Sequence, residues 1–160
     1  MAQPTGPAGL EAALARLLRA GGTSPRVAAF SRLGEHGAVW LALGATMVVA
    51  GAPETRPAWR RATTRVLAAY AVNQTLKVIV RRRRPAGGLS ATPTQLSFPS
   101  AHAATSFAGA RGFAQAGAPA APLYALAGAL AVSRLRLGVH HPTDVVAGAA
   151  LGLLVAGGGR

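Results

Sequence analysis

The chain alternates between apolar segments with a helical period and short polar breaks. In the first segment, four leucines follow this period with arginines on the opposite side: Leu10, Leu14, Leu17 and Leu18. The pattern indicates an amphipathic helix over residues 10–20, which two glycines end. We expect residues 1–22 to form a short amphipathic helix that lies on a membrane, or equally on the surface of a soluble bundle.

Longer apolar segments follow, and each is typical of a helix. They cover residues 36–52, 58–80, 100–115, 120–135 and 142–156. The first of them is near the lower length limit for crossing a bilayer, and the second carries polar side chains that must face the interior if lipid surrounds it. Ser100 suits a helix N-cap, and Pro142 suits a first helical turn. The pattern predicts one all-α domain over residues 1–160, a compact membrane-embedded bundle of about five to six helices with its core at 36–157.

The composition supports a bundle of closely packed helices. Hydrophobic residues make up 51% of the 160 positions and charged residues 13%, which lies at the border between a soluble bundle and a small membrane protein. Aromatic residues are only 5%, so packing must depend on small side chains, as it does between helices in lipid. The net charge of +13 predicts an anionic partner; charge alone allows nucleic acid, anionic lipid or a phosphorylated substrate. The lack of cysteine excludes disulfides and cysteine-ligated metals.

Candidate chemistry is concentrated in three short strings of the second half. KVIVRRRRP contains Lys77 and Arg84, FPSAH contains Ser100 and His102, and SRLRLGVHHPTD contains Arg134, His140 and Asp144. If consecutive helices run antiparallel, all three strings lie at one end of the bundle. Asp144 is the only acidic residue after Glu54, and it follows a histidine by four positions, where it can orient that ring. We therefore expect one site with cations, two imidazoles and one carboxylate, which suits phosphate.

Each string also has a structural interpretation. Residues 81–84 resemble the basic border of a membrane helix, and of these only Arg84, directly before a proline, is a site candidate; the other three are expected at the surface or on lipid headgroups. His140 with Asp144 could be a structural pair at a helix start, and His141 is expected to be structural only. His36 lies near the same end of the bundle and could touch substrate, but it is expected as a helix-boundary residue. Arg111 is an awkward residue for a helix in lipid.

The three strings, in their order and with their internal spacings, resemble the signature motifs of the type 2 phosphatidic acid phosphatase superfamily. Ala101 stands where that family usually has glycine, which matters little in the first turn of a helix. Within the superfamily, the segments FSRLGEHGAVW and LSFPSAHA are similar to those of actinobacterial decaprenyl-phosphoribose phosphatases. The resemblance implies an integral protein of a bacterial plasma membrane that hydrolyses a phosphomonoester or pyrophosphate of a lipid carrier. Which membrane face carries the site stays open.

The resemblance also implies a role for each residue. His140 would attack phosphorus and form a phosphohistidine, Asp144 would hold its ring, and His102 would protonate the leaving oxygen and later activate water. The phosphate would be bound by cations and by the start of a helix: Lys77, Arg84, Arg134, Ser100 and Ala101. This mechanism needs no metal and no cofactor. The expected partners are the lipid phosphate substrate and membrane lipids, without nucleic acid.

Other functions fit parts of the pattern. Vanadium haloperoxidases share this type of pocket, but they are larger soluble proteins, which a short alanine-rich chain does not match. A basic membrane protein without catalytic activity, binding anionic lipid through its arginines, would explain the charge but not the placed histidines and aspartate. Among lipid substrates, undecaprenyl pyrophosphate, phosphatidylglycerophosphate and phosphatidic acid are further candidates.

Overall fold

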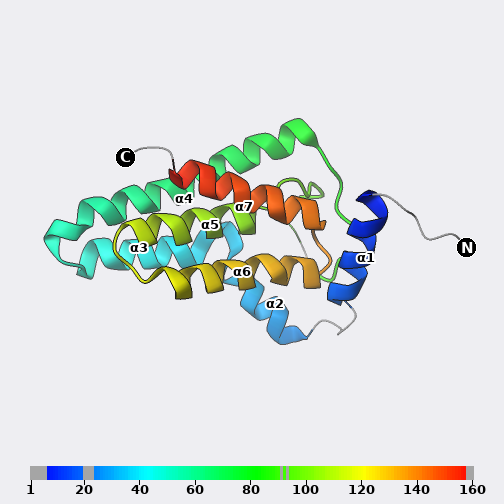
Figure 1. Ribbon diagram of the computed structural model, residues 1–160, viewed down its shortest axis with the longest axis horizontal. Coiled ribbons are helices and arrows are strands. Elements are labelled where there is room, and N and C mark those ends of the chain that lie inside the picture. The colour runs from blue at the N-terminus through cyan, green and yellow to red at the C-terminus, as the bar shows by residue number, and fades with distance from the viewer. Residues whose placement is uncertain (1–6, 20–23, 91, 93, 158–160) are drawn as a thin grey trace, which may run out of the picture.

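The computed structural model describes residues 7–19, 24–90, 92 and 94–157, and over these residues it is all-helical (Figure 1). Its α-helices are α1 (Pro7–Arg19), α2 (Pro25–Arg32), α3 (Ala38–Ala50), α4 (Arg56–Val80), α5 (Ala101–Gln115), α6 (Ala120–Arg136) and α7 (Pro142–Gly157). Two short 3-10 helices, η1 (Glu35–Gly37) and η2 (Pro53–Thr55), precede α3 and α4. The predicted all-helical bundle is confirmed, and each predicted segment corresponds to one helix within a few residues.

Helix α5 is the centre of the bundle. It packs against α4, α6 and α7, while α3 packs mainly against α4. The helices α3 to α7 run roughly along the long axis of the molecule, and α1 and α2 gather at one end of it (Figure 1). That end is where α4 finishes, α5 begins, α6 finishes and α7 begins, as the antiparallel arrangement predicted.

Small residues allow the helices to approach α5 closely. A Cβ atom on Gly109 would lie 2.5 Å from the ring of Trp40, and one on Gly112 would lie 3.2 Å from the side chain of Ala62. Trp40 is fully buried, and its Nε1 donates a hydrogen bond to Ser106 Oγ at 3.0 Å. The few aromatic side chains are therefore packed into space that glycine leaves free.

Helix α2 was not predicted from the sequence. It begins at an N-cap, Ser24, whose hydroxyl accepts a hydrogen bond from the amide of Arg26 at 3.1 Å, and Pro25 occupies the first turn. Its eight residues lack a long apolar run, which is why hydrophobic spacing alone does not reveal it. The helix places Ser31, which is buried, against the end of α6.

Within the described residues, one helical stretch has the length and hydropathy of a membrane span. It covers Pro25–Ala50, is kinked at η1, and has only 22% of its most apolar window buried inside the protein. Helix α7 is apolar but shorter.

Arg111, which is an awkward residue for a helix in lipid, lies with its guanidinium beside Gly157 at the last turn of α7. There it faces the negative end of that helix dipole.

Candidate active site

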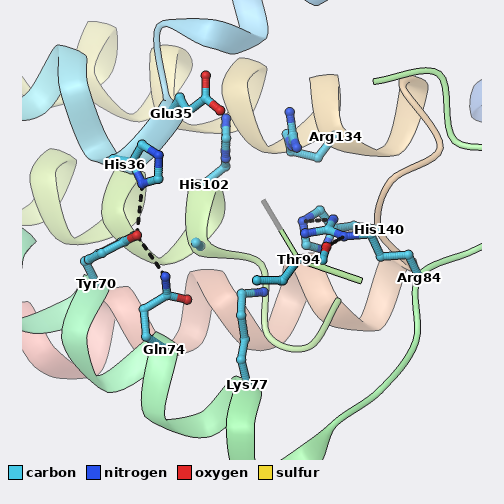
Figure 2. Close-up of a pocket in the computed structure, with 11 residues that line it drawn as sticks. Glu35, His36, Tyr70, Gln74, Lys77, Arg84, Thr94, His102, Arg134 and His140 are labelled. Atoms are coloured by element: carbon cyan, nitrogen blue, oxygen red, sulfur yellow. Dashed lines mark hydrogen bonds between the residues drawn. The ribbon is translucent and has the colours of Figure 1, made fainter. Parts of the chain in front are cut away.

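A pocket opens at the end of the bundle where the three strings meet (Figure 2). Its lining consists of Glu35, His36, Tyr70, Gln74, Lys77, Arg84, Thr94, Ala101, His102, Arg134 and His140. Six of the eight predicted site residues are in this lining. The other two, Ser100 and Asp144, are fully buried directly behind it. The structure thus brings all eight together.

The His140 ring is held in one tautomer by its neighbours. Its Nε2 lies 3.1 Å from Nη1 of Arg84. A guanidinium can only donate, so Nε2 must accept and carries a lone pair, which leaves the proton on Nδ1. Nδ1 lies 3.5 Å from Oδ2 of Asp144. Burial, together with nearby cations, lowers the pKa of His140 to about 4, and Asp144 partly opposes this shift.

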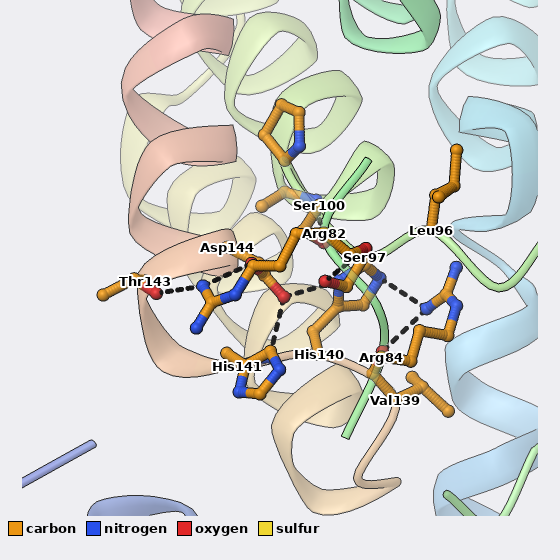
Figure 3. A network of polar contacts seen from close by, with 12 residues as sticks. Arg82, Arg84, Leu96, Ser97, Ser100, Val139, His140, His141, Thr143 and Asp144 are labelled. Atoms are coloured by element: carbon orange, nitrogen blue, oxygen red, sulfur yellow. Dashed lines mark hydrogen bonds and ion pairs between the residues drawn. The ribbon is translucent and has the colours of Figure 1, made fainter. Parts of the chain in front are cut away.

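Asp144 is fixed from two sides (Figure 3). Its Oδ2 accepts a hydrogen bond from the backbone amide of His141 at 2.8 Å, and its Oδ1 accepts one from Nη1 of Arg82 at 2.9 Å. Arg82 also pairs with Glu11 of α1 at 3.0 Å. Asp144 is completely buried, so these donors compensate for the loss of water around the carboxylate.

Arg82 was expected to be only a surface or headgroup residue; its side chain is 31% exposed, but it also donates to the buried Asp144. Helix α4 ends at Arg81, which adopts a left-handed conformation with φ 55°. The chain turns there and sends the next side chain back across the start of α7. His141 holds the site through its backbone amide, in agreement with its structural interpretation.

The Arg84 side chain is anchored by backbone carbonyls at the edge of the pocket. Its Nε donates to Thr94 O at 2.9 Å, and its Nη1 donates to Val139 O at 2.7 Å. Burial lowers the pKa of Arg84, and Asp144 opposes this effect. An arginine stays charged under such conditions, so it brings a fixed positive charge next to His140.

Lys77 is buried on α4 and supports the segment that leads into α5. Its Nζ donates to Pro99 O at 2.8 Å and to Ser97 O at 3.3 Å. Asn73, one turn earlier, donates to the same Pro99 carbonyl at 3.1 Å. The ammonium group therefore both orders this segment and adds positive charge to the pocket.

Ser100 is the N-cap of α5, as predicted. Its hydroxyl accepts from the amide of Ala103 at 3.5 Å, and its own amide donates to Asp144 O at 2.9 Å, which joins the starts of α5 and α7. Ala101 is the first residue of α5, and it lines the pocket. A helix start has amides without partners inside the helix, and these amides suit an anion.

His102 and Arg134 are both held by Ser31 of α2. Nε2 of His102 donates to the Ser31 carbonyl at 3.0 Å. Because a carbonyl only accepts, the proton is on Nε2, and Nδ1 is the nitrogen available to a ligand. Arg134 Nη1 donates to Ser31 Oγ at 2.8 Å, and Ser133 Oγ donates to the same hydroxyl at 3.0 Å.

Sequence reasoning missed five residues that line the pocket: Glu35, His36, Tyr70, Gln74 and Thr94. Of these, His36 was expected at a helix boundary, near the end of the bundle where it could touch substrate, and the structure places it in the lining. A signal did exist for Tyr70 and Gln74, because they share one helical face with Lys77. In the part of the chain that the structure describes, no three His, Asp or Glu side chains form a group suited to a metal ion.

Comparison with known proteins gives matches in sequence and in fold. Residues 58–158 match the PAP2 superfamily. The chain is 45% identical over 125 residues to a decaprenylphosphoryl-5-phosphoribose phosphatase of Mycolicibacterium smegmatis, a match that covers 75% of this chain and 68% of that protein. It is 40% identical over 140 residues to the protein of the same name from Mycobacterium tuberculosis, with 81% and 78% covered.

The fold matches two solved structures. A transmembrane PAP2-type phosphatidylglycerolphosphate phosphatase from Bacillus subtilis has a TM-score of 0.73 at 20% identity, over 93% of this chain and 82% of that chain. Aquifex aeolicus LpxE has a TM-score of 0.69 at 24% identity, over 92% of each chain. The family match covers nearly all of α4, all of α5, α6 and α7, and the three motif strings, whereas η1, which also lines the pocket, lies before it. The chain therefore belongs to the PAP2 superfamily and is a PAP2-type lipid phosphatase.

Proposed function

We propose that this protein removes the terminal phosphate from a decaprenyl lipid that carries 5-phosphoribose, through a phosphohistidine on His140 and without a metal ion. One observation supports the mechanism above the others: the lone pair of His140 Nε2 is directed at Arg84, in a pocket that also holds Lys77 and Arg134. A phosphate that binds these cations lies next to a nitrogen already in the nucleophilic tautomer.

The first step is the attack of His140 Nε2 on phosphorus. The new N–P bond forms as the bond to the leaving oxygen breaks, and the ring becomes positively charged. Asp144 stabilises this charge through Nδ1–H, and its distance of 3.5 Å in the free enzyme is expected to shorten when the ring is charged. Arg82 and the amide of His141 keep the carboxylate in place.

His102 donates a proton in the first step and accepts one in the second. With its Nε2–H bonded to Ser31 O, the ring has Nδ1 left for the leaving oxygen, and this nitrogen must carry a proton to act as the acid. A bound phosphate dianion favours protonation of the ring, since opposite charges attract across a buried pocket. After the leaving group has accepted this proton, the neutral ring takes a proton from water, which attacks the phosphohistidine and regenerates His140.

Charge on the transferring group is neutralised by groups of the protein itself. Lys77, Arg84 and Arg134 supply three positive charges, and the start of α5 at Ser100 supplies amides. Phosphoryl transfer depends mainly on positioning and on this neutralisation, so side chains can replace the metal that other phosphatases use.

The lipid part of the proposal rests on the relatives and on the exposed surface. Both mycobacterial relatives carry the name decaprenylphosphoryl-5-phosphoribose phosphatase, at 45% and 40% identity. Large apolar side chains are exposed around the bundle, among them Val49 at 76% and Leu154 at 74%. A bacterial plasma membrane would cover such a surface and supply a polyprenyl substrate.

The test is phosphate release from decaprenylphosphoryl-5-phosphoribose by the protein in detergent. Activity is expected to persist in EDTA, to be inhibited by vanadate, and to disappear in His140→Ala. His141→Ala is the matched control, since it keeps the backbone amide that holds Asp144, and it is expected to retain most of the activity. Loss of activity in EDTA, or an active His140→Ala variant, would contradict the proposal.

A further inference from the structure

The pocket has a second polar wall that the phosphate chemistry does not use. It consists of Glu35 and His36 of η1 with Tyr70 and Gln74 of α4, and we call it the η1–α4 wall. In Figure 2 it lies across the pocket from Arg84 and His140. We propose that the η1–α4 wall binds the hydroxyl groups of the sugar that carries the scissile phosphate. This inference rests on the proposed function and identifies the part of the protein that selects its substrate.

The charge of the η1–α4 wall does not suit phosphate. Glu35 is the only carboxylate in a lining whose basic side chains, apart from histidine, are Lys77, Arg84 and Arg134. Among the described residues, the ion pairs involve other carboxylates, and Arg134, the cation whose pKa Glu35 raises, is held by a hydrogen bond to Ser31 instead. A carboxylate repels a phosphate but accepts hydrogen bonds from hydroxyl groups. The wall is therefore suited to a neutral, hydroxyl-bearing group.

Hydrogen bonds inside the wall orient its donors and acceptors. Gln74 Nε2 donates to Tyr70 OH at 2.8 Å, and Tyr70 OH lies 2.9 Å from His36 Nδ1. If the phenol, which accepts from Gln74, gives its own proton to Nδ1, the His36 proton is on Nε2. The wall then offers one N–H donor and the acceptor oxygens of Gln74 and Glu35. A sugar hydroxyl both donates and accepts, so vicinal hydroxyls complement this set.

The backbone of η1 is held in an unusual conformation at this wall. His36 has φ 50° and ψ 19°, in the left-handed region that favours glycine, and Gly37 follows with φ 76°. The His36 ring packs edge-on against Tyr70, with centroids 5.7 Å apart and planes at 77°. Residues kept in this region against their preference gather at ligand sites. The contact with Tyr70 explains how the conformation is maintained.

The reaction geometry directs the leaving group to the same wall. In an in-line transfer, the nucleophile and the leaving oxygen lie on opposite sides of phosphorus. His102, the proposed proton donor to the leaving oxygen, lies between His140 and the η1–α4 wall in Figure 2. Gly34, just before η1, is so close to it that a Cβ would lie 2.8 Å from His102 Cδ2. The group attached to the leaving oxygen is thus expected to extend past His102 towards Glu35 and His36.

The experiment compares two substrates that carry the same decaprenyl chain. Decaprenylphosphoryl-5-phosphoribose has the sugar, whereas decaprenyl phosphate has a phosphomonoester without it. We expect the wild-type enzyme to prefer the first in kcat/KM. Tyr70→Phe removes the hydroxyl that orients His36 and Gln74, and it is expected to lower this preference about tenfold, the size of one hydrogen bond to a ligand. Glu35→Gln, which keeps the shape but removes the charge, is expected to act in the same direction.

Tyr124→Phe is the matched control. Tyr124 lies on α6, where its ring packs against Phe107, and it does not line the pocket. This variant is expected to keep the wild-type preference. Inhibition by inorganic phosphate reports on the opposite wall, and an unchanged inhibition constant in Tyr70→Phe shows that the fold and the phosphate site are intact.

The outcomes separate this inference from the function on which it rests. A wild-type enzyme with no preference for the sugar substrate, or a Tyr70→Phe variant that loses activity equally on both substrates, would overturn the sugar site while the phosphatase activity stands. Release of phosphate from neither substrate would overturn the proposed function, and the sugar site with it.

Discussion

The Ser31 hydroxyl accepts a hydrogen bond from Nη1 of Arg134 at 2.8 Å, and the two residues are 103 positions apart in the chain. Through its backbone carbonyl, the same serine holds the His102 ring. One residue of the short helix α2 therefore orients Arg134, the proposed phosphate ligand, by its side chain and His102, the proposed proton donor, by its backbone. The two functions can be separated by substitution.

Ser31→Ala is expected to weaken phosphate binding without changing proton transfer. The change removes the hydroxyl that holds Arg134 but keeps the carbonyl that holds His102, so KM should rise and kcat/KM should fall about tenfold, as for the loss of one hydrogen bond to a charged group. The acid side of the pH profile should stay in place. Thr75→Ala, which deletes a hydroxyl bonded only to the Ala71 carbonyl of its own helix, is the control. Equal effects in both variants would contradict this assignment.

Arg82→Gln is expected to lower kcat more than it changes KM. Its guanidinium donates to Asp144 at 2.9 Å, and without it the buried carboxylate loses one of two fixed donors and holds His140 less well. A loss of about tenfold is expected for a charged hydrogen bond. Arg83→Gln makes the same substitution at the exposed neighbour, and this variant should keep nearly the wild-type kcat and KM. The prediction fails if the two variants behave alike.

The lowered pKa of His140 predicts how the free energy of unfolding changes with pH. Burial lowers this pKa from 6.5 to about 4, so the neutral nucleophile persists in the folded protein well below neutrality. Between these values the unfolded chain binds a proton that the folded protein does not, and stability must fall as the pH decreases through the window. Thermal unfolding in detergent from pH 7 to pH 4 tests this. His140→Asn is expected to show a flatter pH dependence; identical slopes in both proteins would rule out the assignment.

Gly152→Ala is expected to destabilise the bundle by about 1–3 kcal/mol through overpacking. A Cβ at this position would lie 2.8 Å from the backbone nitrogen of Ala108 and closer still to the carbonyl of Ala104, so α7 must move away from α5. Gly128→Ala is the matched change on α6, where nothing lies within 4 Å, and helix propensity predicts a gain of up to about 1 kcal/mol. The test compares the thermal unfolding midpoints of the two variants. A Gly152→Ala variant as stable as Gly128→Ala would be inconsistent with the close packing of α7 against α5.

Much of the fold could be predicted because its signals are local. The N-cap at Ser100 and the proline at position 142 fix where two helices begin, and the apolar segments fix the others to within a few residues. The antiparallel order then places the three strings at one end. Helix α2 was missed because eight residues with mixed polarity carry little periodic signal, although Ser24 and Pro25 mark its start.

The motif residues could be predicted, whereas their supports could not. Ser31 and Arg82 act across the fold, and no spacing in the sequence connects Ser31 with Arg134 or Arg82 with Asp144. Arg82 in particular has the same local sequence context as its arginine neighbours, and only the left-handed turn at Arg81 directs it inward. Such contacts depend on tertiary packing.

The most direct test of the central claim is capture of the phosphoenzyme. The protein is mixed with decaprenylphosphoryl-5-phosphoribose, quenched in alkali, where phosphohistidine is stable, and digested for mass spectrometry. We predict an added phosphate on His140 in the wild-type enzyme and none in His140→Ala. A phosphate found on another residue, or turnover with no phosphate on His140 even when Asp144 and His102 are intact, would contradict the account.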